Sequence, residues 1–141
     1  MPRSKILYVE DDKLQAKATI EFLEKDGYDV TAVKNGLDAL KKIEADEFDV
    51  LIADIKMPGM DGMDLQEALR KAGSPLPILF LTGHGDIPTT VQAMRRGAED
   101  FMTKNAPKEH LLAAVNRALA RNELERAERT RLRALRQPFA L

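Results

Sequence analysis

The sequence has 141 residues, of which 44% are hydrophobic and 32% charged, so it predicts one soluble globular domain with a sizeable core. No run approaches the ~20 apolar residues that a membrane span needs, and we expect no signal peptide and a cytoplasmic location. The absence of cysteine excludes disulfides and thiol chemistry. A formal net charge of −1 argues against nucleic-acid binding by the chain as a whole.

Apolar segments that suit strands alternate along the chain with segments of helical spacing. The expected strands cover residues 5–9, 28–33, 48–53, 78–82 and 99–102. The expected helices cover residues 13–25, 36–45, 63–71 and 87–96, and a fifth begins near residue 107. In the first helix, we expect the buried face to carry Leu14, Ala18, Phe22 and Leu23.

Strict alternation of strands and helices predicts a parallel sheet with helices on both faces. Right-handed crossovers favour a flavodoxin-like (βα)5 doubly wound α/β fold with strand order 2-1-3-4-5. The first and third strands are neighbours in that order. Their carboxyl ends therefore bring Glu10, Asp11 and Asp12 close to Asp54, although Asp12 suits a helix cap better than a ligand role.

Acidic, hydroxyl and basic side chains follow the expected strands at this edge of the sheet: Glu10, Asp11, Asp54, Thr82 and Lys104. Carboxylates that are packed together repel one another and need a cation at neutral pH. An all-oxygen ligand set favours Mg²⁺ over Ca²⁺. A metal, a lysine, a hydroxyl and a nucleophilic carboxylate together suit phosphoryl transfer.

Four segments carry a resemblance to a known family: Ile6-Leu7-Tyr8-Val9-Glu10-Asp11-Asp12, Asp54 with Met57-Pro58-Gly59-Met60-Asp61-Gly62, Leu81-Thr82-Gly83-His84, and Gly97-Ala98-Glu99-Asp100-Phe101-Met102-Thr103-Lys104. Over residues 5 to about 120 the sequence resembles the receiver domain of a two-component response regulator. It looks most like the FixJ-type subgroup, whose members usually carry a helix-turn-helix output domain.

The resemblance implies a role for each matching residue. Asp54 would be the phospho-acceptor, and Glu10, Asp11 and the backbone carbonyl of Lys56 would join it in binding Mg²⁺. Lys56 also lies two residues past Asp54, where the family tunes the lifetime of the phosphate. The alternative for Lys56 is an ordinary surface residue.

The same resemblance implies that Thr82 and Lys104 sense the phosphate and that Phe101 is the aromatic switch. His84, two residues past Thr82, is either a tuning residue or a surface-loop histidine. One departure affects the lysine, because the family usually has proline after it, commonly with a cis bond. Asn105 stands there in this sequence, and a cis bond before a non-proline residue costs about 3 kcal/mol. Whether the Lys104–Asn105 bond is cis stays open here.

Residues 121–136 hold six Arg and three Glu and no Gly or Pro, which predicts a helix continuous with the fifth one and projecting beyond the domain. We expect a receiver domain over residues 1–120 and a helical linker or extension over 121–141, with the output domain absent. A weak coiled-coil seam runs through Leu124, Ala127, Arg131 and Leu135. The alternative is a solvated extension.

The expected function is a signalling switch that accepts a phosphoryl group from a sensor histidine kinase and controls an output, with transcription expected. It would not be an enzyme beyond its own phosphorylation and dephosphorylation. Expected partners are the kinase and a second copy, bound through the fourth helix, fifth strand and fifth helix or through the C-terminal helix. DNA would be bound only through an output domain.

Two rival functions remain to be weighed. A phosphatase of the haloacid type wants a second Asp two residues after its nucleophile, where Lys56 stands. A docking module that is never phosphorylated would not need the acidic, Thr and Lys positions, which are all present.

Overall fold

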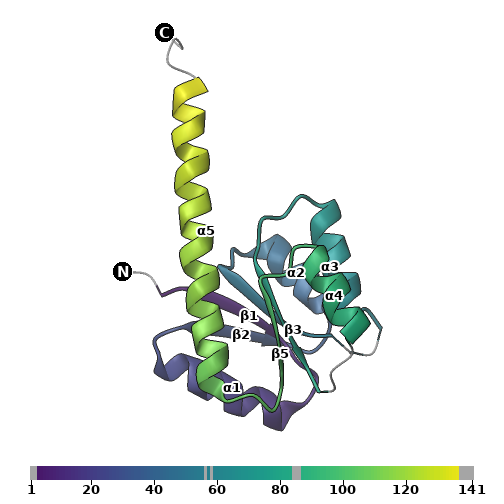
Figure 1. The fold of residues 1–141 in the computed structure, drawn as a ribbon. Helices are drawn as coiled ribbons and strands as arrows, with labels where there is room; N and C mark the ends of the chain where they lie inside the picture. The colour runs from purple at the N-terminus through teal and green to yellow at the C-terminus, as the bar shows by residue number, and fades with distance from the viewer. Residues whose placement is uncertain (1–2, 56, 58, 84–86, 137–141) are drawn as a thin grey trace.

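The computed structural model describes residues 3–55, 57, 59–83 and 87–136 of the chain (Figure 1). These residues form five strands: β1 Lys5–Val9, β2 Asp29–Val33, β3 Val50–Asp54, β4 Ile78–Thr82 and β5 Asp100–Thr103. All neighbours in the sheet are parallel, in the order β2-β1-β3-β4-β5. The predicted flavodoxin-like fold and its strand order are therefore confirmed.

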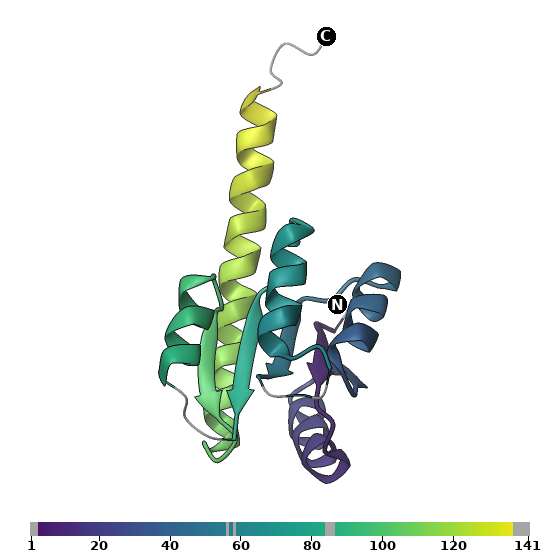
Figure 2. The same cartoon turned by 90° about the vertical axis from the view of Figure 1, so that its right-hand side faces the viewer.

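The helices alternate with the strands as α1 Lys13–Lys25, α2 Gly36–Ala45, α3 Gly62–Lys71, α4 Ile87–Arg95 and α5 Lys108–Arg136. Buried residues of α1 and α5 form one core with one face of the sheet, and those of α2, α3 and α4 form a second core with the other face (Figures 1 and 2). The bounds expected from sequence differ from the observed ones by at most two residues.

The central strands β3 and β4 each begin with four consecutive apolar residues and end in a polar one, Asp54 or Thr82. Every residue of β3 and β4 is buried, which suits strands covered on both faces. The strand β2 is at the edge of the sheet and is only half-buried. The carboxyl ends of β1, β3 and β4 are thereby fixed side by side within a rigid layer.

Aspartate caps begin two of the helices that follow this edge. The side chain of Asp12 accepts hydrogen bonds from the backbone N–H groups of Leu14 and Gln15, which confirms its expected capping role. Asp61 caps α3 in a reciprocal capping box with Asp64.

The expected buried face of α1 was right for Leu23, which is fully buried, and for Phe22, which packs against the core, but wrong for the other two residues. Leu14 is 83% exposed, and Ala18 is exposed as well. Besides Leu23, the helix buries Ala16 and Thr19, which were not expected there. The first half of α1 faces the core through the small side chains of Ala16 and Thr19, so the exposed Leu14 does not mark the inner face there.

The predicted continuous C-terminal helix is confirmed, because α5 runs unbroken to Arg136 and its second half projects from the domain (Figures 1 and 2). Its last described contacts with the domain are made by Arg121, which pairs with Glu99, and by the buried Asn122. Every described side chain from residue 123 to residue 135 is exposed. No helix in the described part of the chain has the length and apolar character to cross a lipid bilayer.

Candidate functional site

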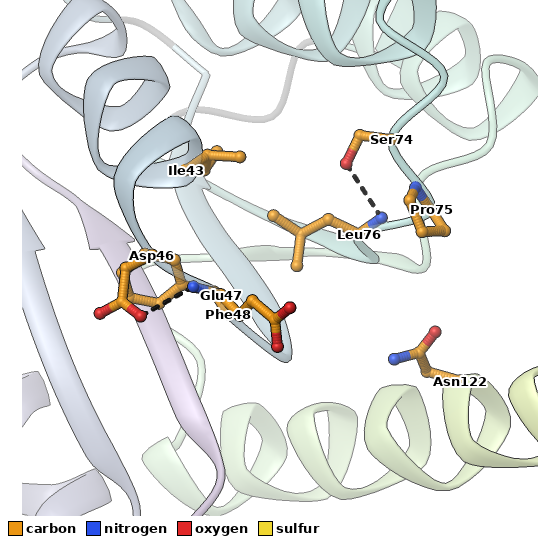
Figure 3. A pocket seen from close by; sticks show the side chains of 8 residues that line it. All are labelled: Ile43, Asp46, Glu47, Phe48, Ser74, Pro75, Leu76 and Asn122. Atoms are coloured by element: carbon orange, nitrogen blue, oxygen red, sulfur yellow. Dashed lines mark hydrogen bonds between the residues drawn. The ribbon is translucent and has the colours of Figure 1, made fainter.

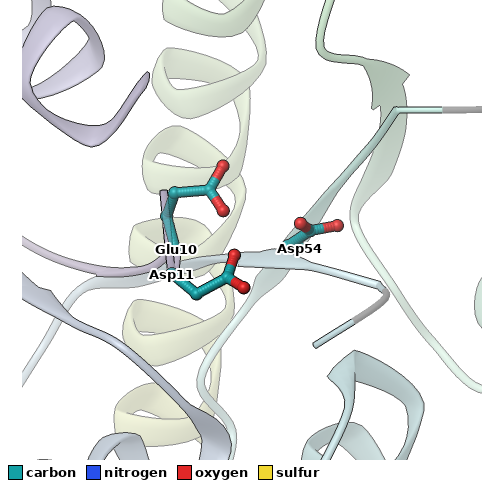
Figure 4. Close-up of side chains that lie close together, drawn as sticks. All are labelled: Glu10, Asp11 and Asp54. Carbon is teal, nitrogen blue, oxygen red and sulfur yellow. The ribbon is translucent and has the colours of Figure 1, made fainter. Parts of the chain in front are cut away.

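Three carboxylates meet at the carboxyl edge of the sheet (Figure 4). Glu10 and Asp11 follow β1, and Asp54 ends the neighbouring strand β3. One ligand oxygen from each of the three lies within 4.8 Å of the others. Glu10 and Asp54 are buried, while Asp11 is exposed, so the cluster opens to solvent on the side of Asp11.

Lys104 reaches into this cluster from the loop after β5. Its Nζ atom lies 2.6 Å from an oxygen of Asp54 and 2.7 Å from an oxygen of Glu10. Its backbone N–H donates to the carbonyl of Thr82, and the following turn closes with a hydrogen bond from Ala106 to Thr103. The peptide bonds of the described residues, including Lys104–Asn105, are trans. Lys104 therefore reaches the carboxylates without the proline that the resemblance led us to expect.

Burial and charge together set the protonation of the site. Burial raises the pKa of Glu10, and the nearby Lys104 ammonium only partly offsets this effect. Burial lowers the pKa of Lys104, but its hydrogen bonds to Asp54 and Glu10 outweigh this and hold the pKa above its ordinary value. Lys104 is thus a fixed positive charge between two carboxylates.

The carboxylate set also fits a hard cation. All three side chains offer oxygen, the ligand that Mg²⁺ prefers. The Oε2 atom of Glu10 is buried and accepts no hydrogen bond from the described residues. A buried carboxylate oxygen without a donor is costly unless a positive charge satisfies it. The site therefore has both the ligands and the electrostatic need for a second cation besides Lys104.

The other predicted residues surround this cluster. Thr82 is buried at the end of β4, one residue beyond the position that pairs with Asp54. Phe101 lies half-buried on β5, in register with Phe80, and packs against the core shared with α3 and α4. Lys56 and His84 lie outside the described residues, so their predicted roles are not placed.

Gly62 is a residue of the site that our sequence interpretation missed, because we treated it only as part of a turn. A Cβ atom there would lie 2.6 Å from the carbonyl oxygen of Asp54 and 2.9 Å from the Cα of Ile55. The start of α3 therefore packs directly on the backbone that holds Asp54. The available signal was the glycine itself, since a residue without a side chain allows another segment of backbone to approach closely.

A cavity of about 350 Å³ lies at the opposite edge of the sheet, near the amino ends of β3 and β4 (Figure 3). The side chain of Asn122 from α5 lines it together with residues from α2, from the loop between α2 and β3, and from the loop before β4: Ile43, Asp46, Glu47, Phe48, Ser74, Pro75 and Leu76. Since the carboxylates lie at the carboxyl ends of the strands, this cavity is separate from the candidate site.

Comparisons with known proteins agree with this geometry. Residues 6–116 match the family model described as the response regulator receiver domain. The chain is 41% identical over 111 residues to the tetrathionate response regulatory protein TtrR of Salmonella typhimurium, covering 79% of this chain and 54% of that protein. It is 35% identical over 118 residues to the transcriptional regulatory protein FixJ of Bradyrhizobium diazoefficiens, covering 83% of this chain and 58% of that protein.

Among solved structures, the response regulator StyR superposes with a TM-score of 0.88 at 32% identity, over 99% of this chain and 70% of that one. The chain spans about half the length of the curated relatives TtrR and FixJ. The similarity to these two proteins therefore concerns only part of each.

Proposed function

Because the chain belongs to the family of response regulator receiver domains, we propose that it is a phosphorylation-dependent switch with Asp54 as the phospho-acceptor. Receiver domains of two-component systems interact with histidine kinases, so a sensor histidine kinase is the proposed donor. The observation that carries the assignment is the carboxylate of Asp54 at the carboxyl end of β3, 2.6 Å from the Lys104 ammonium and clustered with Glu10 and Asp11.

The proposed reaction is the transfer of a phosphoryl group from a phosphohistidine to Asp54. A carboxylate oxygen of Asp54 forms the new bond to phosphorus, the phosphorus–nitrogen bond of the donor breaks, and the released imidazole nitrogen takes up a proton. Lys104 would neutralise phosphoryl oxygens, since its ammonium already contacts Asp54. Thr82 would donate a hydrogen bond to another phosphoryl oxygen.

Glu10, Asp11 and Asp54 would hold Mg²⁺, and we propose the backbone carbonyl of Lys56, which lies outside the described residues, as a further ligand. The buried oxygen of Glu10 without a hydrogen-bond donor supports this assignment. When bound, Mg²⁺ supplies positive charge that stabilises the phosphoryl oxygens.

The phospho-acceptor is tested by incubating the protein with Mg²⁺ and acetyl phosphate and measuring its mass. The chain should gain one phosphoryl group, and Asp54→Asn should gain none because an amide is not a nucleophile here. Asp12→Asn is the matched control, since Asn also caps a helix well and Asp12 is next to the site. Unchanged labelling of Asp54→Asn would remove Asp54 from the role, and no labelling of the parent chain would favour the docking-module alternative.

Phosphorylation would act by favouring one of two existing conformations. We propose that Thr82 moves toward the phosphoryl group and that Phe101, now half-buried on β5, turns into the space this opens. His84 and Lys56 would tune the lifetime of the phosphate. Beryllofluoride, a phosphoryl mimic, should shift the NMR signals of the Thr82 methyl group and the Phe101 ring in the parent chain and leave those of Asp54→Asn unchanged. Identical spectra with and without the mimic would contradict this coupling.

The proposed output is transcription, through a domain beyond the region that resembles a receiver. FixJ and the relative DctD of Pseudomonas aeruginosa are both named transcriptional regulatory proteins. We propose that the chain belongs to a FixJ-like subgroup, with a receiver domain over residues 1–120 and a linker over residues 121–141. The protein would bind DNA only through an output domain, and it would be located in the cytoplasm. The domain would act as a signalling switch and not as an enzyme on other substrates. A homodimer would form through α4, β5 and α5 or through the projecting part of α5.

A further inference from the structure

The projecting part of α5, residues 123–136, carries one face on which Leu124, Glu128, Arg131 and Leu135 follow one another at spacings of four, three and four. We call these four residues the seam face. Leu124 is 72% exposed and Leu135 is 62% exposed. Glu128 and Arg131 form an exposed ion pair 2.5 Å long between them. Such spacing is that of a coiled-coil seam, with two apolar ends and a charged centre.

We propose that this face binds the same face of a second copy of the chain, with the two helices antiparallel. In that arrangement Leu124 lies opposite Leu135 of the partner subunit, and Glu128 lies opposite Arg131 of the partner subunit. The two-fold axis repeats both contacts, as an isologous interface requires. The inference extends the proposed homodimer by naming its surface, its register and its orientation.

Charge decides between the two possible orientations. A parallel pair in register would place Glu128 against Glu128 of the partner subunit and Arg131 against Arg131 of the partner subunit. Two like-charge layers would then occupy the centre of a seam with only two leucine layers. The antiparallel pair converts both layers into opposite-charge contacts, so charge complementarity selects it.

The free length of the helix matches this register. Pairing Leu124 with Leu135 also pairs residue 123 with residue 136, so the overlap covers the part of α5 that extends past the buried Asn122. Asn122 and Leu124 are two residues apart, which places them about 200° apart around the helix. The seam face therefore points away from the domain beneath it, and each domain lies at an opposite end of the helix pair. The views of Figures 1 and 2 show the projecting helix clear of the other elements.

Disulfide trapping tests the orientation directly, since the sequence contains no cysteine. Full-length Leu124→Cys and Leu135→Cys chains, distinguished by a small mass tag, are mixed and mildly oxidised. The mixed disulfide should form at least about tenfold faster than either symmetric one. In the antiparallel pair the two copies of residue 124, one from each subunit, lie about 16 Å apart along the helix axis. A disulfide can bridge Cα atoms only up to a separation of ~7 Å, so the symmetric disulfide cannot form within the pair. Arg133→Cys, on the opposite face of the helix, gives the rate of random collision.

A second pair of variants tests the charged centre. Adding Glu128→Arg to both cysteine chains should reduce the mixed disulfide toward the Arg133→Cys rate, because arginines then face one another. Combining Glu128→Arg on the Leu124→Cys chain with Arg131→Glu on the Leu135→Cys chain should restore it. Symmetric disulfides that dominate would show a parallel pair, and equal rates for all chains would show an unpaired helix. Either result overturns the proposal, while labelling of Asp54 by acetyl phosphate tests the phospho-acceptor role independently.

Discussion

Lys104 is the residue on which the charge balance of the site depends in the absence of a bound metal. Its ammonium contacts both Glu10 and Asp54 at hydrogen-bonding distance, and its own side chain is mostly buried. Because burial already raises the pKa of Glu10, loss of the lysine would raise it further. The free energy of folding should then depend on pH through this carboxyl group.

We predict that Lys104→Ala abolishes the conformational response to the phosphoryl mimic and leaves Mg²⁺ binding largely intact. Without metal, the variant should have a free energy of unfolding at pH 7 that is lower by about 1–3 kcal/mol. A carboxyl group whose pKa is raised by folding contributes stability below its unfolded pKa and loses it as the pH rises through the folded value. The difference in unfolding free energy between the parent chain and the variant should therefore shrink as the pH falls toward the ordinary glutamate pKa of about 4.3. Urea unfolding at several pH values measures it.

The exposed Lys108→Ala is the control for this prediction, because it removes a nearby lysine that does not contact the carboxylates. A deficit that stays constant from pH 7 to pH 4 would show that the variant loses packing and not charge compensation. A variant that still responds normally to the mimic would show that another cation senses the phosphate.

The acidic residues and Lys104 could be found from the sequence because each lies at or just after the carboxyl end of a strand, and parallel strands bring their carboxyl ends together. Gly62 could not be found in this way. Its importance arises because a Cβ atom at this position would lie only 2.6 Å from the carbonyl oxygen of Asp54, a closeness that only the packed structure defines.

At the scale of helices and strands, periodicity predicted which segments form but not always which face is buried. The strands β3 and β4 are apolar up to their last residues, Asp54 and Thr82, and are buried on both faces, so no choice of face arises. In α1 the choice depends on Ala16 and Thr19, which are small enough to lie against the sheet, while Leu14 remains in solvent. Hydrophobicity alone ranks Leu14 above Thr19 and gives the wrong answer.

The helix α5 has two parts, and truncation should separate them. A chain that ends after Glu123 keeps the Arg121–Glu99 ion pair and the buried Asn122, and should unfold within about 2 °C of the full chain. A chain that ends after Ala120 loses both contacts and should unfold several degrees lower, since removing a buried side chain costs roughly 1–2 kcal/mol. Thermal unfolding by circular dichroism measures the difference.

Sedimentation of the same two truncated chains connects this prediction to assembly. If the projecting helix pairs, the full chain should show concentration-dependent association that both truncated chains lack. Equal unfolding temperatures for the two truncated chains would mean that Arg121 and Asn122 contribute nothing to the domain.

At the scale of the whole molecule, the metal-free fold keeps three carboxylates together with Lys104 as the cation that contacts Glu10 and Asp54. Repulsion within this cluster opposes folding, because the unfolded chain can separate the charges. A cation that binds the folded state and not the unfolded state adds RT ln(1 + [L]/Kd) to the free energy of unfolding. The receiver should therefore be more stable with Mg²⁺ than without it.

We predict that raising Mg²⁺ to about 100 times its dissociation constant increases the free energy of unfolding by about 2.7 kcal/mol, as measured by urea unfolding at constant ionic strength. Asp11→Ala should lose most of this gain, since it removes the exposed ligand of the cluster without disturbing a buried side chain. Asp26→Ala is the matched control, because it removes one exposed negative charge at the far end of α1. An equal Mg²⁺ response in the two variants would mean that the ion stabilises the protein by general screening, and the assignment of Asp11 as a ligand would fail.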